Sequence, residues 1–183
     1  MGINTYPTPA TSSVPNWTLL GRTTSSAGSY SFTGLGGYRQ LKVNCGGFAT
    51  STNSVIMCMQ FNSDGTSLYG NNYVGYLQAT TPFSSYAYPA DPFYRITGLA
   101  NSNATNAGPF YVLIDRANAT DSAKTMSCES SYSTGSGLQQ YVRSVGTYNS
   151  TTPITSISIF GNPSTTSWNL ASYNSFIEVW GAN

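Results

Sequence analysis

The stretch NSVIMCMQFNSDG, residues 53–65, decides the fold class. Large apolar side chains stand at every second position from Val55 to Phe61, which is the period of a β-strand. Ile56 and Cys58 lie between them, so both faces of this strand are largely apolar. Asn62-Ser63-Asp64-Gly65 then supplies a turn. We therefore expect a central strand here, closed by a turn.

Similar short patterns extend outward on both sides of this stretch. In YRQLKVNC, residues 38–45, apolar and polar side chains alternate, which predicts a half-buried strand. Further strands are expected at residues 17–21, 29–34, 73–78, 93–99, 110–117, 123–132, 138–146, 154–161 and 175–181. Turn-rich segments, among them Thr80–Pro92, join them, and no window keeps the spacing of an amphipathic helix. About ten short strands with long connections predict an all-β, jelly-roll-like antiparallel β-sandwich.

The composition supports this interpretation and limits the choice of partner. Only 7% of the 183 residues are charged, whereas about a quarter are charged in a typical soluble domain. The net charge is +1 and the seven cations are scattered, so we expect no nucleic-acid partner. A surface so poor in charge suits a protein that stays docked in an assembly.

The chain divides into two parts by composition. Residues 1–16, MGINTYPTPATSSVPN, carry three prolines and predict an extended anchoring arm, which docks on a partner through Tyr6, Pro7, Pro9 and Pro15. Residues 17–183 predict a single β-sandwich domain. No apolar run reaches the roughly 20 residues of a membrane-spanning helix, and the N-terminus lacks a signal-peptide profile. We therefore expect synthesis in a cytoplasm and no membrane partner.

The sequence offers little for catalysis or metal binding. It contains no histidine, which removes the commonest general base and many metal sites, and it has six carboxylates. Asp115 and Glu129 could meet, but a glycosidase needs its carboxylates about 5–10 Å apart across a cleft. Asn62-x-Asp64-Gly65 is too short of acidic ligands for calcium and is interpreted as a turn. We expect no enzyme activity, no metal and no cofactor.

Two further features leave alternatives open. Cys45, Cys58 and Cys128 are expected to be buried free thiols, with one disulfide plus one thiol as the alternative. The aromatic residues Phe83, Tyr86, Tyr88, Phe93 and Tyr94 surround prolines and predict an exposed patch that binds protein or stacks on sugars. The alternative is that these rings pack under a long loop or between identical subunits.

Several segments resemble small β-sandwich virion proteins of tailed bacteriophages, namely capsid decoration (cement) proteins and tail-fibre tip domains. The resembling pieces are WTLLG at residues 17–21, YSFTGLGGYRQLKV at 30–43, VIMCMQFNSDGTSLYGNNY at 55–73, ITSISIFG at 154–161 and FIEVWGAN at 176–183. The resemblance implies a homotrimer or another symmetric oligomer on the virion exterior, with the arm laid against the shell or tail. It implies no catalytic residue.

Two roles follow from this resemblance. The first is a capsid decoration or cement protein that docks on the major capsid protein through its arm and stabilises the shell. The second is a tail-fibre or receptor-binding tip, attached to tail proteins, that contacts a glycan or protein on the host surface.

Overall fold

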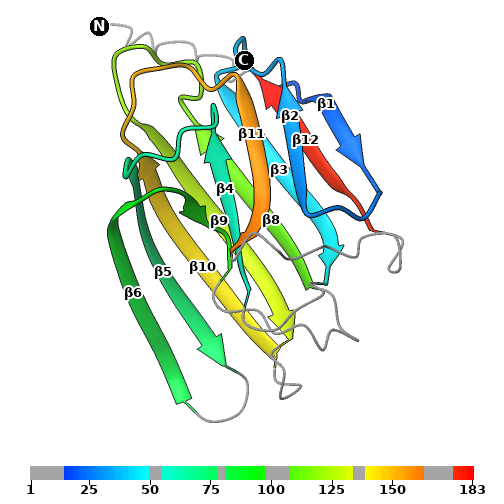
Figure 1. The fold of residues 1–183 in the computed structure, drawn as a ribbon, viewed down its shortest axis with the longest axis vertical. Helices are drawn as coiled ribbons and strands as arrows, with labels where there is room; N and C mark the ends of the chain where they lie inside the picture. Colours follow the sequence, from blue (N-terminus) through cyan, green and yellow to red (C-terminus); the bar gives the residue numbers. More distant parts are fainter. Residues whose placement is uncertain (1–14, 50–54, 78–80, 98–107, 134–138, 163–174) are drawn as a thin grey trace, which may run out of the picture.

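The computed structural model describes residues 15–49, 55–77, 81–97, 108–133, 139–162 and 175–183. These residues form two antiparallel β-sheets that pack face to face, and no helix occurs among them (Figure 1). The prediction of an all-β antiparallel sandwich is confirmed.

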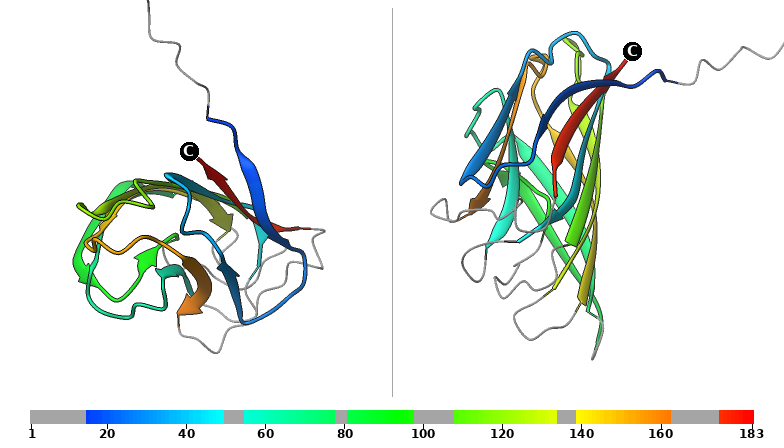
Figure 2. Two further views of the ribbon diagram at one scale, coloured as in Figure 1. Left: turned by 90° about the horizontal axis from the view of Figure 1, so that it is seen from above. Right: turned by 90° about the vertical axis from the view of Figure 1, so that its right-hand side faces the viewer.

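The larger sheet contains eight strands in the spatial order β1-β12-β3-β8-β9-β10-β5-β6. Their bounds are β1 Thr18–Thr23, β12 Ile177–Ala182, β3 Gln40–Phe48, β8 Gly108–Asp115, β9 Lys124–Ser133, β10 Gln139–Tyr148, β5 Tyr69–Leu77 and β6 Thr81–Asp91. The smaller sheet has the order β2-β11-β4-β7, with β2 at Ser29–Thr33, β11 at Ser156–Asn162, β4 at Ile56–Phe61 and β7 at Tyr94–Arg95. Figure 2 shows the two layers from above and from the side.

The strand pairs are nested. Strand β1 pairs with β12, β2 with β11, β3 with β8 and β4 with β7, so each pair lies inside the previous one along the chain. Nested antiparallel pairs divided between two sheets are the pairing order of a jelly roll. Two hairpins, β5–β6 and β9–β10, are inserted into this order and both widen the larger sheet.

The core forms between the sheets because alternate side chains of each strand point inward. On the smaller sheet the inward residues include Met57, Met59 and Ile157, all fully buried. On the larger sheet they include Val43 and Val112, also fully buried. The predicted central strand is thus β4, an interior strand of the smaller sheet between β11 and β7. On its other face Cys58 is fully buried, whereas Ile56 and Gln60 are half-buried.

The prediction of a turn-rich segment over Thr80–Pro92 is wrong, because residues 81–91 form β6. Prolines at 82 and 89 favoured a loop, since proline has no N–H for a strand ladder. Strand β6 lies at the edge of the larger sheet, where one side of the strand has no partner and proline is tolerated. Its register with β5 shifts between Tyr69 and Asn71, next to Pro89. Of the strand expected at residues 93–99, residues 93–97 are described, and among them only Tyr94–Arg95 pair, as β7.

Lys124, the first residue of β9, is completely buried. Its Nζ donates to the carbonyl oxygens of Ala119 at 2.8 Å, Ser150 at 2.7 Å and Ser122 at 3.4 Å. The ammonium group therefore ties the β8–β9 connection to the segment that follows β10.

Candidate functional site

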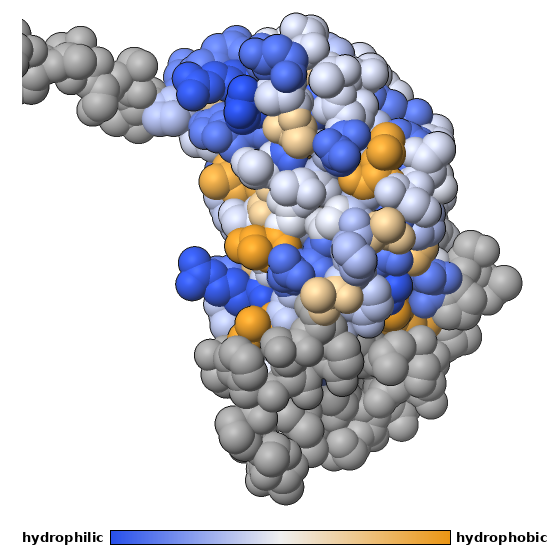
Figure 3. Space-filling model, turned by 90° about the vertical axis from the view of Figure 1, so that its left-hand side faces the viewer, coloured by the Kyte–Doolittle hydropathy of each residue, from blue (hydrophilic) through white to orange (hydrophobic). Residues whose placement is uncertain are grey.

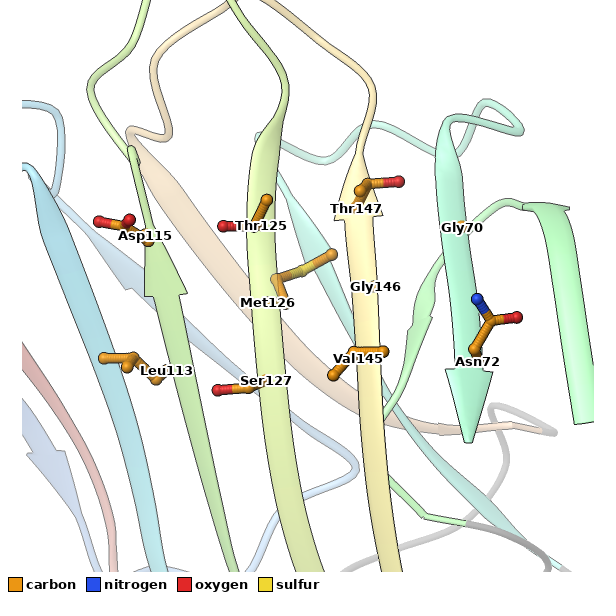
Figure 4. Close-up of a pocket in the computed structure, with 10 residues that line it drawn as sticks. All are labelled: Gly70, Asn72, Leu113, Asp115, Thr125, Met126, Ser127, Val145, Gly146 and Thr147. Atoms are coloured by element: carbon orange, nitrogen blue, oxygen red, sulfur yellow. The ribbon is translucent and has the colours of Figure 1, made fainter. Parts of the chain in front are cut away.

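The outer face of the larger sheet carries two rows of side chains that cross four strands. Leu113, Ser127, Val145 and Asn72 form one row over β8, β9, β10 and β5, because they are direct register partners (Figure 4). Asp115, Thr125, Thr147 and Gly70 form the next row in the same way. These rows line a shallow hollow of about 500 Å³. In these two rows Leu113 and Val145 are apolar, Asp115 is charged, and the other residues are small and uncharged.

Asp115 and Glu129, two carboxylates on this face, are not close enough to each other to act as a glycosidase pair. Asp115 accepts a hydrogen bond from Nε2 of Gln40 at 3.2 Å and stands opposite Thr125. Glu129 stands opposite Tyr111, so four residues of strand, or about 13 Å, separate it from the level of Asp115. This spacing exceeds the 5–10 Å or so that two glycosidase carboxylates require. Glu129 instead lies 3.7 Å from the guanidinium of Arg143, in an ion pair exposed to solvent.

Three large hydrophobic side chains are exposed on the same face. Tyr111 and Tyr141 are each 39% exposed, and Val145 is 53% exposed. Tyr111 and Tyr141 line a second, smaller hollow of about 230 Å³ together with Glu129. Partial burial raises the pKa of Tyr111, and the nearby Glu129 charge raises it further, so its phenol stays neutral. The face therefore presents neutral aromatic and aliphatic surface.

Elsewhere the exposed hydrophobic residues are dispersed. On the side of the molecule that carries β5 and β6, hydrophobic residues are scattered among hydrophilic ones and do not gather into one large patch (Figure 3).

The structure divides the predicted aromatic patch. The prediction that Tyr94 is exposed is wrong, because this residue is fully buried. Its hydroxyl group forms a hydrogen bond of 2.8 Å with that of Ser144. Phe83 and Tyr86 lie in β6, and their side chains are outside the described part of the structure. Tyr94 belongs to the core of the sandwich and not to an exposed patch.

Tyr88 and Phe93 are both half-buried, but they have different surroundings. The Tyr88 ring stacks on Tyr73 with centroids 6.0 Å apart, and the Arg95 guanidinium lies 3.9 Å from its centroid. Arg95 is held by Asp91, with Nε 2.7 Å from the carboxylate. Phe93 instead meets Phe160 edge to face, with centroids 5.9 Å apart, on the smaller sheet. The predicted patch is thus two separate ring clusters linked by Arg95.

The arm lies mostly outside the described residues, which begin at position 15. Tyr6, Pro7 and Pro9 fall in that excluded part, and Pro15 is exposed immediately before β1. The root of the arm is held by a contact that the sequence did not indicate. The Lys42 ammonium lies 4.5 Å from the ring centroid of Trp17 and 5.3 Å from that of Trp180. No local pattern could have found it, because the three residues come from distant parts of the chain.

The structure tests the predictions made for the three cysteines and for the turn after β4. All three cysteines are buried and free, so the free-thiol prediction is confirmed and the disulfide alternative is wrong. Burial raises the pKa of Cys45 and of Cys128 to about 12. The turn at residues 62–65 is confirmed, with the Asp64 N–H donating to the Phe61 carbonyl at 2.8 Å.

Searches for metal sites and membrane spans found neither in the described ranges. No group of three or more potential metal-ligating side chains occurs there. No helix in that part of the chain is long and apolar enough to cross a membrane.

Comparisons with protein-family models, with curated protein sequences and with solved structures give no match for this chain. The function therefore has to be argued from the sequence and from the geometry above.

Proposed function

We propose that this protein is a structural, non-catalytic component on the exterior of a tailed-bacteriophage virion. In its leading form the proposal is a capsid decoration or cement protein, which docks on the major capsid protein through its N-terminal arm and stabilises the shell. A homotrimer is the expected assembly.

The observation that carries the proposal is the outer face of the larger sheet. It exposes Tyr111, Tyr141 and Val145, and charged side chains in the same row are paired, Glu129 with Arg143 on one side and Arg22 with Glu178 on the other. Protein interfaces are enriched in tyrosine and arginine and poor in other charged residues at their centre. A face of this composition suits lasting contact with other protein subunits.

The root of the arm supports the same proposal. Strand β1 is an edge strand whose sheet partner is β12, and Arg22 on β1 lies 3.2 Å from Glu178 on β12. Together with the contact of Trp17 on Lys42, this ion pair fastens the start of the sandwich to the sheet. A load on the arm would therefore pass into the larger sheet.

Particle binding tests the proposal directly. Purified protein is added to virions from the same source that have been stripped of it, and bound copies are counted by quantitative mass spectrometry. We expect rebinding in hundreds of copies for the full chain and none after deletion of residues 1–16. The deletion variant must keep the unfolding transition of the full chain, which shows that the sandwich is intact.

Two results would contradict the proposal. Virions that contain no copy of the protein would exclude a virion role altogether. Full rebinding by the shortened chain would exclude docking through the arm. As a further variant, Tyr141→Lys places a charge on the proposed contact face and should weaken assembly, whereas Thr33→Lys, at an exposed position of the smaller sheet, should not.

The second candidate function is a receptor-binding tip. The observation that favours it is a separate hollow on the smaller sheet, which Phe93 lines. A tip protein would be present in a handful of copies per particle and would adsorb to host cells in a saturable manner.

A further inference from the structure

A hollow of about 650 Å³ lies on the outer face of the smaller sheet, away from the face described above. Strands β2, β11 and β4 form its floor, and the segment that leads into β7 contributes Pro92 and Phe93. Its volume falls within the range of about 300–1,000 Å³ that is usual for small-molecule sites.

One row of the floor is polar. Ser31, Ser158 and Gln60 are direct partners across β2, β11 and β4, so their side chains lie side by side on the outer face. The hydroxyl oxygens of Ser31 and Ser158 are 3.3 Å apart. Nε2 of Gln60 donates to the Pro92 carbonyl at 3.0 Å, which fixes the amide at the end of the row. Hydroxyl and amide groups of this kind both donate and accept hydrogen bonds.

The neighbouring row contains one aromatic residue, Phe160, between Ser29 and Cys58. Phe160 lies two residues beyond Ser158 on β11, so the two side chains share a face and stand about 7 Å apart along the strand. Phe93 meets Phe160 edge to face at an interplanar angle of 89°. Because the rings meet in this way, one of them keeps a flat face clear of the other. Apolar ring surface therefore lies beside the hydroxyl row.

Phe93 is held in place from both sides. Pro92, which precedes it, has a fixed φ angle, and its carbonyl is bonded to Gln60. Tyr94, which follows it, is fully buried and bonded to Ser144. The Arg95 guanidinium lies 5.3 Å from the Phe93 ring centroid and is itself paired with Asp91. A ring fixed in this way loses little conformational entropy when a ligand binds.

The lining contains no ionisable side chain. A charged ligand would find no counter-charge in the hollow, and the nearest cation on this face, Arg95, is neutralised by Asp91. A purely apolar ligand would cut the serine and glutamine groups off from water and leave their remaining donors and acceptors unused, which is costly. The ligand that fits has an apolar face that packs on the rings and a neutral edge whose hydroxyl groups reach the polar row. The two rows are separated by about the width of one sugar ring.

We propose that this hollow is a binding site for a short neutral oligosaccharide. The C–H face of a pyranose ring packs on Phe160 and Phe93, and the ring hydroxyls bond to the row of Ser31, Ser158 and Gln60. The site does not depend on the arm or on the larger sheet, so it can be tested separately from the proposed virion role.

The test is a binding assay on the full chain with defined probes. Neutral tetrasaccharides of glucose, of galactose and of N-acetylglucosamine are screened by saturation-transfer NMR, with a sialylated trisaccharide as the charged probe. Any ligand found is then titrated by calorimetry. We expect at least one neutral probe to bind and the charged probe not to bind.

Two variants locate the site. Phe160→Ala removes the aromatic surface and should weaken binding by about tenfold or more. Ser31→Trp fills the hollow from an exposed position, so it should abolish binding without disturbing the core. Tyr141→Ala removes an exposed ring from the opposite sheet and serves as the control, with unchanged affinity expected. Thermal unfolding of each variant confirms that the fold is kept.

Three results would overturn the inference. The first is the absence of binding by every neutral probe at about 10 mM, a concentration that would detect even millimolar affinity. The second is binding by the charged probe alone. The third is neutral binding that Ser31→Trp leaves intact, because the ligand would then sit elsewhere. None of them affects the particle-binding experiment, which does not use this hollow.

Discussion

Replacing Lys124 by methionine tests how the buried ammonium group stabilises the fold. Methionine has a similar length and is apolar, so it fills the space but donates no hydrogen bond. The carbonyl oxygens of Ala119 and Ser150, which now accept from Nζ at 2.8 and 2.7 Å, lose this donor. A buried carbonyl without a partner costs about 1–3 kcal/mol, and because Ala119 and Ser150 are only half-buried, the lower end of this range applies.

The expected loss is about 2 kcal/mol, the lower end of the range for two such carbonyls. The contact with the Ser122 carbonyl, at 3.4 Å, is too long to add much. The free energy of unfolding of a typical domain is about 5–15 kcal/mol, so this loss would be a measurable share of it. With a urea dependence of about 2 kcal/mol per M, the midpoint of unfolding should fall by about 1 M.

The measurement is equilibrium unfolding in urea, followed by tryptophan fluorescence. Arg39→Met is the matched control, because it also removes one positive charge, but from an exposed position. Its effect should stay within about 0.5 kcal/mol. A loss below about 1 kcal/mol for Lys124→Met would show that water or rearranged backbone satisfies the carbonyls, and would refute the structural role given to the ammonium group.

Three further predictions concern packing, pH and thiol chemistry. Gly146→Ala should lower the free energy of unfolding by at least about 2 kcal/mol, because its Cβ would clash with the carbonyl oxygen of Gly70 on β5. Gly37→Ala, which has open space around it, should leave stability nearly unchanged, and equal thermal melts of the two variants would disprove the prediction. Hydrogen bonds from the side chain and the backbone N–H of Thr66 lower the pKa of Asp64 in the folded protein. The carboxylate therefore stabilises the fold at any pH above the pKa that Asp64 has in the unfolded chain. This contribution is lost as the pH falls through the lower pKa of the folded state. Urea midpoints measured from about pH 5 to pH 3 should therefore fall less steeply in Asp64→Asn, and unchanged steepness would contradict this assignment. The three cysteine thiols should react with a disulfide reagent only after denaturation, and reaction of any of them in the native protein would show that it is accessible.

The sequence predicted the strands whose alternation is regular and whose ends carry turn residues. The pattern from Val55 to Phe61 became β4, and the alternation in residues 38–45 became part of β3. It failed at β6, because proline acts as a loop signal unless the strand is known to lie at a sheet edge. Edge position depends on the order of strands in space, which local patterns do not contain.

The candidate sites show the same limit more sharply. Phe93 was predicted as a binding residue and does line a hollow, but Tyr94 beside it points into the core. In a strand, neighbouring residues face opposite ways, so a cluster of aromatic residues in sequence is divided between two faces. The polar row of Ser31, Ser158 and Gln60 could not be predicted, because it exists only through the pairing of β11 with β2 and β4.

The nested strand pairs have a consequence for how the protein is made. Among the nested pairs, β4 and β7 leave the ribosome with the shortest delay between the two partners. Strand β8 emerges next and completes the pair with β3, β11 then completes the pair with β2, and β12 completes the pair with β1 last. Contacts between distant parts of a chain form slowly, because long loops must first close. The first strand to emerge therefore waits longest for its partner. The contact of Lys42 with both Trp17 and Trp180 forms only at that last step, so Trp17 is fixed on the sheet only after β12 has paired.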